Sequence, residues 1–144
     1  MNKIEILQAN TPELRQKALE IRLKVFVEEQ KIPIEYEQDG LDETAVLLLA
    51  FQNQNAVATG RMIIHKNHAH IARIAVLNEY RGLQIAQKIV LELEKIAIEK
   101  NVTDLVLYPH IYLENFYKKL GFYTENIDFQ IVAGYQLLTM RKKI

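Results

Sequence analysis

The feature that most constrains the fold of this chain is an uninterrupted run of seven apolar residues, from Ala45 to Phe51. Such a run is far too short to cross a bilayer, because a membrane-spanning helix needs about 20 residues. It is typical of a central strand that is covered on both faces. The run therefore predicts a sheet with helices packed on its two sides.

Strand and helix patterns follow one another along the whole chain. Strands are expected at residues 3–8, 45–51, 56–64, 68–76, 104–108, 127–132 and 136–141. Helices are expected from Pro12 to about Glu28 or Glu29, from Ile85 to a cap at Asn101, and at 112–120 before a cap at Gly121. Residues 31–43 form a long loop with room for a short helical turn. The order β-α-β-β-β-α-β-α-β-β predicts a single domain over residues 1–144, with an α+β (mixed α/β) fold.

Composition restricts the function classes that such a domain can have. Eighteen Lys and Arg residues balance eighteen Asp and Glu residues, so the formal net charge is zero. Dedicated nucleic-acid binders usually carry a basic excess, so no nucleic-acid partner is expected. The chain has no cysteine, which excludes disulfides, thiolate zinc sites and a cysteine nucleophile. No segment has the pattern of a targeting signal or a membrane span, so we expect a cytoplasmic protein with no membrane partner.

The sequence around Arg81 predicts an anion-binding site. A strand ends at Val76, a short loop carries Arg81 and Gly82, and a long helix begins near Ile85. The first amides of a helix lack internal partners and attract anions, while Gly82 allows a close approach and Arg81 adds positive charge. This loop suits a pyrophosphate, although an ordinary strand-to-helix turn with a solvated arginine explains the spacing equally well.

Three motifs resemble those of one enzyme superfamily. Residues 73–76 (Arg-Ile-Ala-Val) and 80–86 (Tyr-Arg-Gly-Leu-Gln-Ile-Ala) resemble the acetyl-CoA loop of the GNAT N-acetyltransferases. Residues 115–122 resemble the family's Phe-Tyr-x-x-x-Gly-Phe segment. Residues 22–30, followed by Pro33, Glu35, Asp39 and Gly60-Arg61, resemble the ElaA-like branch. Gln84 stands where the family usually has its central glycine, so either its side chain turns away from the pyrophosphate or the affinity for the cofactor falls.

The resemblance implies a GNAT-like acyl-CoA N-acyltransferase fold, with a central mixed sheet flanked by helices. It also implies direct acetyl transfer from acetyl-CoA, as co-substrate, to a primary amine of a small molecule or a protein. Members often form homodimers through their C-terminal strands. Acetyl-CoA would lie where strands 68–76 and 104–108 splay apart, held by Ile74, Ala75, Val76, Arg81, Gly82, Leu83, Gln84, Ile85, Ala86 and His110. His110 takes the place of a common asparagine, and a loop histidine without any such role is an equal alternative.

The catalytic residues that the resemblance implies are Tyr117, Glu29 and His70. Tyr117 falls where many members have a tyrosine near the cofactor sulfur, and a phenol can protonate the departing thiolate. It can also pack against Phe122 as part of a helix cap. Glu29, the adjacent Glu28 and His70 are candidate bases for the amine. An exposed strand residue without a catalytic role is the alternative for His70, and a chain of waters is the alternative to all three.

Several features leave other interpretations open. Leu47 stands where many members of the branch carry a histidine, which argues against a base at that point. No carboxylate is interleaved with the histidines at 65, 68 and 70, so no metal is expected. Asp39, Asp42 and Glu43 are either an acidic patch that attracts a cationic amine or a solvated loop. The second functional hypothesis is a non-catalytic acyl-CoA-binding sensor or interaction module.

Overall fold

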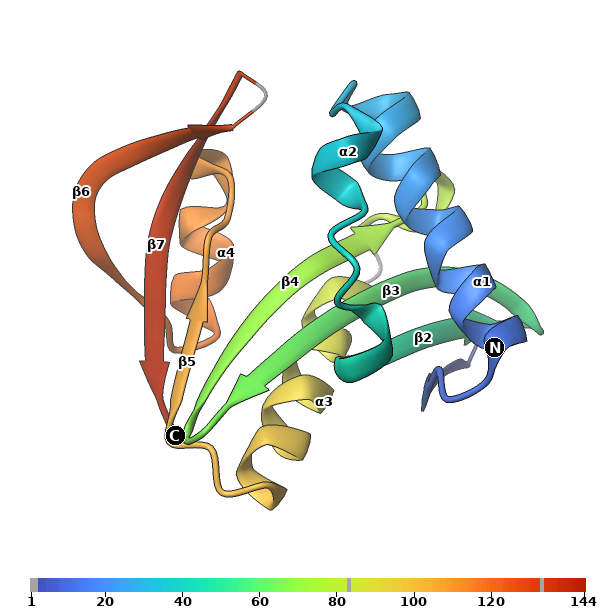
Figure 1. Cartoon of the computed structure of the whole chain (residues 1–144), viewed down its shortest axis with the longest axis horizontal. Coiled ribbons are helices and arrows are strands. Elements are labelled where there is room, and N and C mark those ends of the chain that lie inside the picture. The colour runs from blue at the N-terminus through green and yellow to red at the C-terminus, as the bar shows by residue number, and fades with distance from the viewer. Residues whose placement is uncertain (1–2, 83, 133) are drawn as a thin grey trace.

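The computed structural model describes residues 3–82, 84–132 and 134–144, and its elements follow the expected order (Figure 1). The helices are α1 (Pro12–Arg22), α2 (Ile34–Glu37), α3 (Ile85–Glu99) and α4 (Glu114–Lys119). The strands are β1 (Ile4–Gln8), β2 (Val46–Gln52), β3 (Asn55–His65), β4 (His68–Val76), β5 (Asp104–Leu107), β6 (Tyr123–Val132) and β7 (Tyr135–Lys143). They form one mixed sheet in the order β1-β2-β3-β4-β5-β7-β6, in which β4 and β5 are parallel and the other neighbours antiparallel. The predicted fold class is confirmed.

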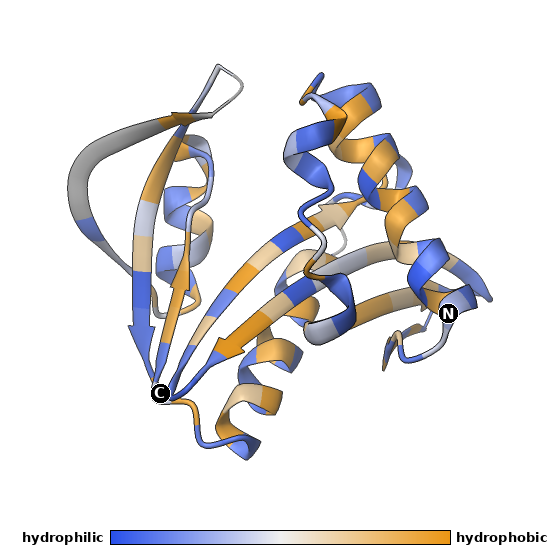
Figure 2. Cartoon of the chain, viewed as in Figure 1, coloured by the Kyte–Doolittle hydropathy of each residue, from blue (hydrophilic) through white to orange (hydrophobic). Residues whose placement is uncertain are grey.

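The apolar run at 45–51 lies mostly on β2, and its side chains alternate between two cores. Leu48 and Ala50 pack into the core beneath α3, whereas Leu47 and Leu49 pack into the core beneath α1. Side chains of successive strand residues point to opposite faces, so a strand covered on both faces must be apolar throughout. Figure 2 shows apolar residues along both α1 and α3, the helices that supply the facing surfaces. Leu47 is a core residue with 3% exposure.

The first helix changes its hydrogen bonding before it ends. We expected one α-helix from Pro12 to Glu28 or Glu29, but α1 ends at Arg22 and a π-helical segment, Leu23–Glu29, follows it. The amide of Gln30 donates to the carbonyl of Val25 at 3.1 Å, which is the longer spacing of a π-helix. Segments of this kind occur frequently at functional sites.

The C-terminal part has longer strands than the sequence pattern indicated. β6 begins at Tyr123, not at residue 127, and the helix expected at 112–120 divides into a 3₁₀ turn, Ile111–Leu113, and α4. The predicted caps are confirmed, because Asn101 and Gly121 both have positive φ angles, 65° and 96°. After α4, the amide of Phe122 donates to the carbonyl of Tyr117 at 3.1 Å and that of Gly121 to Lys118 at 3.0 Å, as in a Schellman motif.

The parallel strands β4 and β5 separate soon after they begin. They pair only where His68–His70 faces Asp104–Val106, and beyond that point they diverge (Figure 1). A bulge bends β4 in this region, because Arg61 of β3 opposes Ala72 while Thr59 opposes Ala75. Arg73 lies in the bulge with a φ of +55°. The predicted splaying of these two strands is confirmed, and it positions the site described next.

Candidate active site

A cavity of about 300 Å³ opens where β4 and β5 separate. One wall is the bulged part of β4, from His70 to Ile74, and the opposite wall is the end of β5 with residues 107–110. The segment from the π-helix through α2 closes one side, and residues of α4 and β7 close the rest. The cavity therefore lies in the opening where the resemblance placed the thioester.

The backbone segment expected to hold the pantetheine arm, residues 74–76, is only partly accessible to a ligand. Ile74 lines the cavity, while Ala75 is 2% exposed and packs into the core beneath α1. The carbonyl of Val76 accepts a hydrogen bond from Nε of Arg81 at 3.0 Å. The side chain of Arg81 thus already binds one of the three residues whose backbone was expected to contact the pantetheine arm.

The start of α3 has the features of an anion site. The first intrahelical bond runs from the amide of Lys88 to the carbonyl of Gln84, so the amides at 85–87 precede it without helical partners. Gln84 caps the helix in a left-handed conformation, φ +62°, and its side chain makes no capping hydrogen bond. Gly82 has a φ of +81° with open space around it, whereas Ile85 is buried and Ala86 half-buried. Leu83, the remaining residue expected here, lies outside the described residues.

His70 faces the cavity from β4. Its ring meets the ring of Tyr108 edge to face, with centroids 5.1 Å apart. Burial lowers the pKa of His70 below its ordinary 6.5, and the positive charges of Arg61 and Arg73 lower it further. The imidazole is therefore neutral near pH 7, which is the form that can accept a proton.

Tyr117 lines the cavity from α4. Its side chain is 5% exposed and packs edge-on against Phe122, with centroids 5.8 Å apart, so the predicted packing contact of the helix cap is present. Burial raises the pKa of Tyr117 to about 12. The phenol keeps its proton at any physiological pH and can donate it.

Comparison with known proteins identifies the family that shares this architecture. Residues 9–122 match the acetyltransferase (GNAT) family. The chain belongs to the GNAT family. A sequence relative is YjcF of Bacillus subtilis (strain 168), described as an uncharacterized N-acetyltransferase, which is 28% identical over 137 residues, 95% of this chain and 97% of the relative.

Solved structures share the fold of this GNAT protein over its whole length. Escherichia coli ElaA has a TM-score of 0.86 at 23% identity, with 99% of each chain covered. The PaiA N-acetyltransferase of Thermoplasma acidophilum, solved in complex with coenzyme A, has a TM-score of 0.78 at 22% identity, again with 99% of each chain covered. These likenesses show the fold.

Two residues of this GNAT protein that the sequence placed in separate roles bind one another. The guanidinium of Arg81 contacts both carboxylate oxygens of Glu29, at 2.6 and 2.9 Å. Its remaining donors reach the Val76 carbonyl at 3.0 Å and Oδ1 of Asn78 at 3.3 Å. In this structure Glu29 therefore neutralises the charge of Arg81, the residue that the sequence places at the pyrophosphate site. The hydrogen bond from Arg81 also lowers the pKa of Glu29, which makes that carboxylate a weaker base.

His110 lines the cavity within a cluster of aromatic rings. It stacks on Tyr112 with centroids 5.3 Å apart and meets Tyr135 edge-on at 4.6 Å. Burial lowers its pKa, and its Nδ1 is buried without a hydrogen-bond partner among the described residues. The hydroxyl of Tyr135 donates to the carbonyl of Gln30 at 2.7 Å, which ties β7 to the end of the π-helical segment. Sequence reasoning missed Tyr135, since no local motif marks it.

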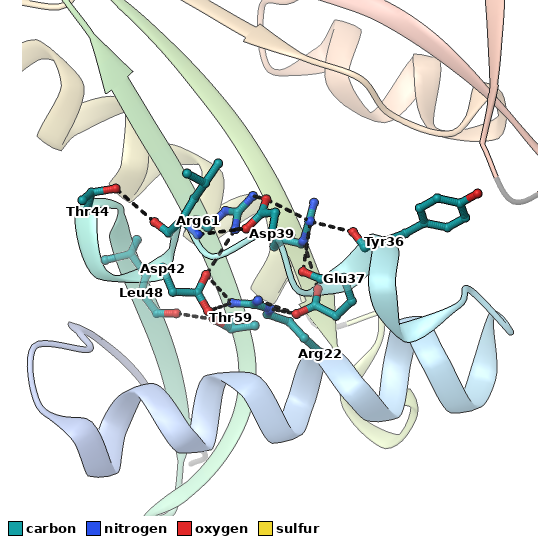
Figure 3. A network of polar contacts seen from close by, with 11 residues as sticks. Arg22, Tyr36, Glu37, Asp39, Asp42, Thr44, Leu48, Thr59 and Arg61 are labelled. Carbon is teal, nitrogen blue, oxygen red and sulfur yellow. Dashed lines mark hydrogen bonds and ion pairs between the residues drawn. The ribbon is translucent and has the colours of Figure 1, made fainter.

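A partly buried ionic network lies between α1, the α2 segment and the bulge of β4 (Figure 3). Its members are Arg22, Arg61 and Arg73 with Glu37, Asp39 and Asp42. The hydrogen bond from Arg61 to Asp39, 2.7 Å long, holds the pKa of this carboxyl at about 2. Neither alternative for the acidic residues, a patch that attracts a cation or a solvated loop, fits Asp39 and Asp42, because arginines pair with both carboxylates. Sequence patterns do not reveal the network, although Arg22, Asp39 and Arg61 are parts of the branch motif.

In the described part of the chain, no group of three or more His, Cys, Asp or Glu residues is arranged to hold a metal ion. None of the helices in that part has both the length and the apolar character needed to cross a membrane.

Proposed function

We propose that the protein transfers an acetyl group from acetyl-CoA directly to a primary amine. The observation that carries this proposal is the cavity in the β4–β5 opening, where a neutral histidine and a protonated tyrosine line the walls. Family membership supports an acyl-CoA-dependent transfer. The ElaA-like motifs at residues 22–39 and 60–61, together with the likeness to ElaA in fold, support placement in that branch.

His70 is the group we propose as the base. The attacking amine must lose a proton, and His70 combines a place on the cavity wall with a lowered pKa. Glu29 is a weaker candidate than the sequence suggested, because both of its oxygens bind Arg81 and it does not line the cavity. His110 is neutral for the same reason as His70, but its ring is stacked among aromatic neighbours.

Tyr117 is the group we propose as the acid. As the amine nitrogen bonds to the thioester carbon, negative charge develops on the carbonyl oxygen, and amides of the bulged strand are the donors proposed to stabilise it. When the carbon–sulfur bond breaks, the Tyr117 hydroxyl donates its proton to the departing thiolate. The proton of the amine passes to His70, and the extra proton on His70 balances the one that Tyr117 has lost, so the two groups return to their starting states. Because the amine itself attacks the thioester carbon, no acyl group is attached to the enzyme.

Coenzyme A would lie on the α3 side of the sheet. We propose that the amides at the start of α3 bind its pyrophosphate and that Ile74 contacts the pantetheine arm. The lack of a capping side chain at Gln84 supports this assignment, since the first amides of α3 are left for a ligand.

Acetyl-CoA binding and amine-dependent release of CoA test the proposal together. Acetyl-CoA is expected to raise the melting temperature, and a panel of primary amines to accelerate CoA release. Stabilisation with no amine-dependent release would favour the alternative, a non-catalytic acyl-CoA sensor. The absence of stabilisation would contradict both functions.

The variant Tyr117→Phe tests the acid. We expect kcat to fall by at least about tenfold while the Kd for CoA stays within about twofold, since general acids contribute about 10²–10⁴ in rate. Tyr123→Phe is the control, because Tyr123 is 47% exposed on β6 and does not line the cavity. Equal turnover in both variants would remove Tyr117 from the mechanism.

A further inference from the structure

The cavity restricts the class of the second substrate of this site. We infer that the acceptor is a primary monoamine with an apolar or aromatic group, such as an arylalkylamine, and not a polycation such as a polyamine or an aminoglycoside. This inference rests on the proposed transfer function. It follows from three observations: which face of the sheet the cavity walls come from, how their charges are paired, and how large the cavity is.

The walls left for the acceptor are apolar and aromatic. Phe26, Ile32 and Tyr36 line the cavity and belong to the segment on the α1 side of the sheet. His70 shares that side, because its strand neighbours Ala69 and Ile71 both point into the core beneath α3. The proposed pyrophosphate site is at the start of α3, on the other side. The cofactor and the acceptor thus approach from opposite faces and meet at the bulge of β4.

The cavity offers no carboxylate to a cation. Glu37 is the one acidic residue among the described residues that line it. Its side chain is 2% exposed, and its two oxygens accept hydrogen bonds from Nε of Arg22 at 2.8 Å and Nε of Arg73 at 2.9 Å. A second ammonium group of a polyamine would enter this cavity without a partner, and burying an unpaired charge is strongly unfavourable.

Arg73, the arginine that lines the cavity, is also paired, like Glu37. Arg73 also donates from Nη2 to the carbonyls of Tyr36 and Glu37, at 3.0 and 3.1 Å, and to Asp39 at 3.3 Å. Burial lowers the pKa of His70 and of His110, so both rings are neutral near pH 7. The site therefore presents no net charge to the acceptor, and its recognition depends on apolar contact.

The size of the cavity also limits the acceptor. At about 300 Å³ it is at the lower end of the range for small-molecule sites, which is about 300–1,000 Å³. Part of that volume must hold the acetyl group. A single ring on a short chain fits the remainder better than the several rings of an aminoglycoside.

The test compares kcat/KM for 2-phenylethylamine, propylamine, spermidine and kanamycin, measured as CoA release from acetyl-CoA at one pH and ionic strength. We expect 2-phenylethylamine to exceed spermidine and kanamycin by at least tenfold. Equal or better turnover of spermidine would overturn the inference while leaving the transferase function in place. No release with any amine, in a protein that acetyl-CoA stabilises, would overturn the transferase function and the inference with it.

Two variants locate the preference in the cavity wall. Tyr36 is 56% exposed, and no hydrogen bond between described residues uses its hydroxyl, so Tyr36→Ala should fold. We expect its KM for 2-phenylethylamine to rise at least fivefold, with little change for propylamine; Tyr123→Ala is the control. Ile32→Asp adds a carboxylate to the wall and should shift the kcat/KM ratio of spermidine to 2-phenylethylamine upward at least tenfold. An unchanged ratio in Ile32→Asp and an unchanged KM in Tyr36→Ala would overturn the assignment of this wall to the acceptor.

Discussion

Glu29 and Arg81, which are 52 residues apart in the sequence, form a bidentate ion pair with oxygen–nitrogen distances of 2.6 and 2.9 Å. The pair joins the end of the π-helical segment to the loop that leads into α3. It therefore connects the acceptor side of the site to the proposed pyrophosphate site. Because the pair is about 40% exposed, its contribution to stability is small, and its main effect is on the local charge that a ligand meets.

Breaking this pair should strengthen cofactor binding. In Glu29→Gln, the guanidinium of Arg81 loses its carboxylate partner, so the start of α3 carries more positive potential. We expect the Kd for CoA, measured by calorimetry at low salt, to fall about two- to threefold, which corresponds to about 0.5 kcal/mol. The effect should shrink as salt screens the charges.

Glu28→Gln is the matched control for Glu29→Gln. It removes the same charge one residue earlier, from an exposed side chain to which the structure assigns no ion pair among the described residues. CoA affinity that changes equally in both variants would mean that net charge, and not the pairing with Arg81, is responsible. Weaker CoA binding in Glu29→Gln alone would mean that the pair pre-organises the loop.

The pH dependence of turnover should follow the protonation of His70. Because its pKa is lowered below 6.5 by burial and then by Arg61 and Arg73, kcat/KM should fall on the acid side with an apparent pKa below 6.5. His70→Gln should lower kcat by about 10²-fold and remove this acid limb. His68→Gln is the control on the same strand, since His68 is exposed and does not line the cavity. An unchanged limb in His70→Gln would assign the base elsewhere.

The titration of His70 should also make the free energy of unfolding depend on pH. His70 has a lower pKa in the folded chain than in the unfolded chain, so the unfolded chain binds this proton first as the pH falls below 6.5. The contribution is fully present above pH 6.5 and is lost as the pH falls toward the folded-state pKa. In urea unfolding between pH 7 and pH 5, His70→Gln should lose less stability than the wild type. An equal loss would mean that His70 is as solvated in the folded protein as in the unfolded chain.

Glu37 should be the most sensitive carboxylate for folding. It is buried between Arg22 and Arg73, so Glu37→Gln leaves the buried Arg22 and the half-buried Arg73 short of a partner. We expect the free energy of unfolding to fall by about 3 kcal/mol. Glu35→Gln, an exposed position on the same helix, should change it by less than about 0.5 kcal/mol. A loss below 1 kcal/mol in Glu37→Gln would show that the network is dispensable for folding.

Replacing Gln84 by glycine tests how a side chain at this position affects stability and CoA binding. Its φ of +62° is a left-handed conformation, which costs a residue with a Cβ roughly 1 kcal/mol. Gln84→Gly is expected to raise the free energy of unfolding by up to about 1 kcal/mol and to lower the Kd for CoA about threefold.

Lys66→Gly is the matched control for Gln84→Gly. Lys66 has a φ of +56° in the turn between β3 and β4, which bonds the segment after the end of α3 and not its start, so Lys66→Gly should change stability without changing CoA affinity. Weaker CoA binding in Gln84→Gly would mean that the glutamine side chain takes part in the site.

Local patterns were sufficient for most of the fold. The alternation of Leu47, Leu48 and Leu49 between two cores follows from the period of a strand, and Gly121 ends α4 because glycine adopts positive φ at little cost. The π-helical segment at Leu23–Glu29 was not predictable in the same way, because an apolar stripe looks alike in an α-helix and in a π-helix. The early start of β6 depends on its pairing with β7, a contact that strand periodicity does not report.

The sequence by itself determined the order of the elements, the two-sided cover of β2, the caps and the positions of the family motifs, because each depends on neighbours within a few residues. Tertiary structure alone decided which charges meet. Glu29 and Arg81, or Glu37 and Arg73, lie far apart in the chain, and their pKa values and availability depend on distances that only the folded sheet sets. Ionic and hydrogen-bonding energies change steeply over a few ångströms, so the chemistry of the cavity follows from the fold and not from the residue types alone.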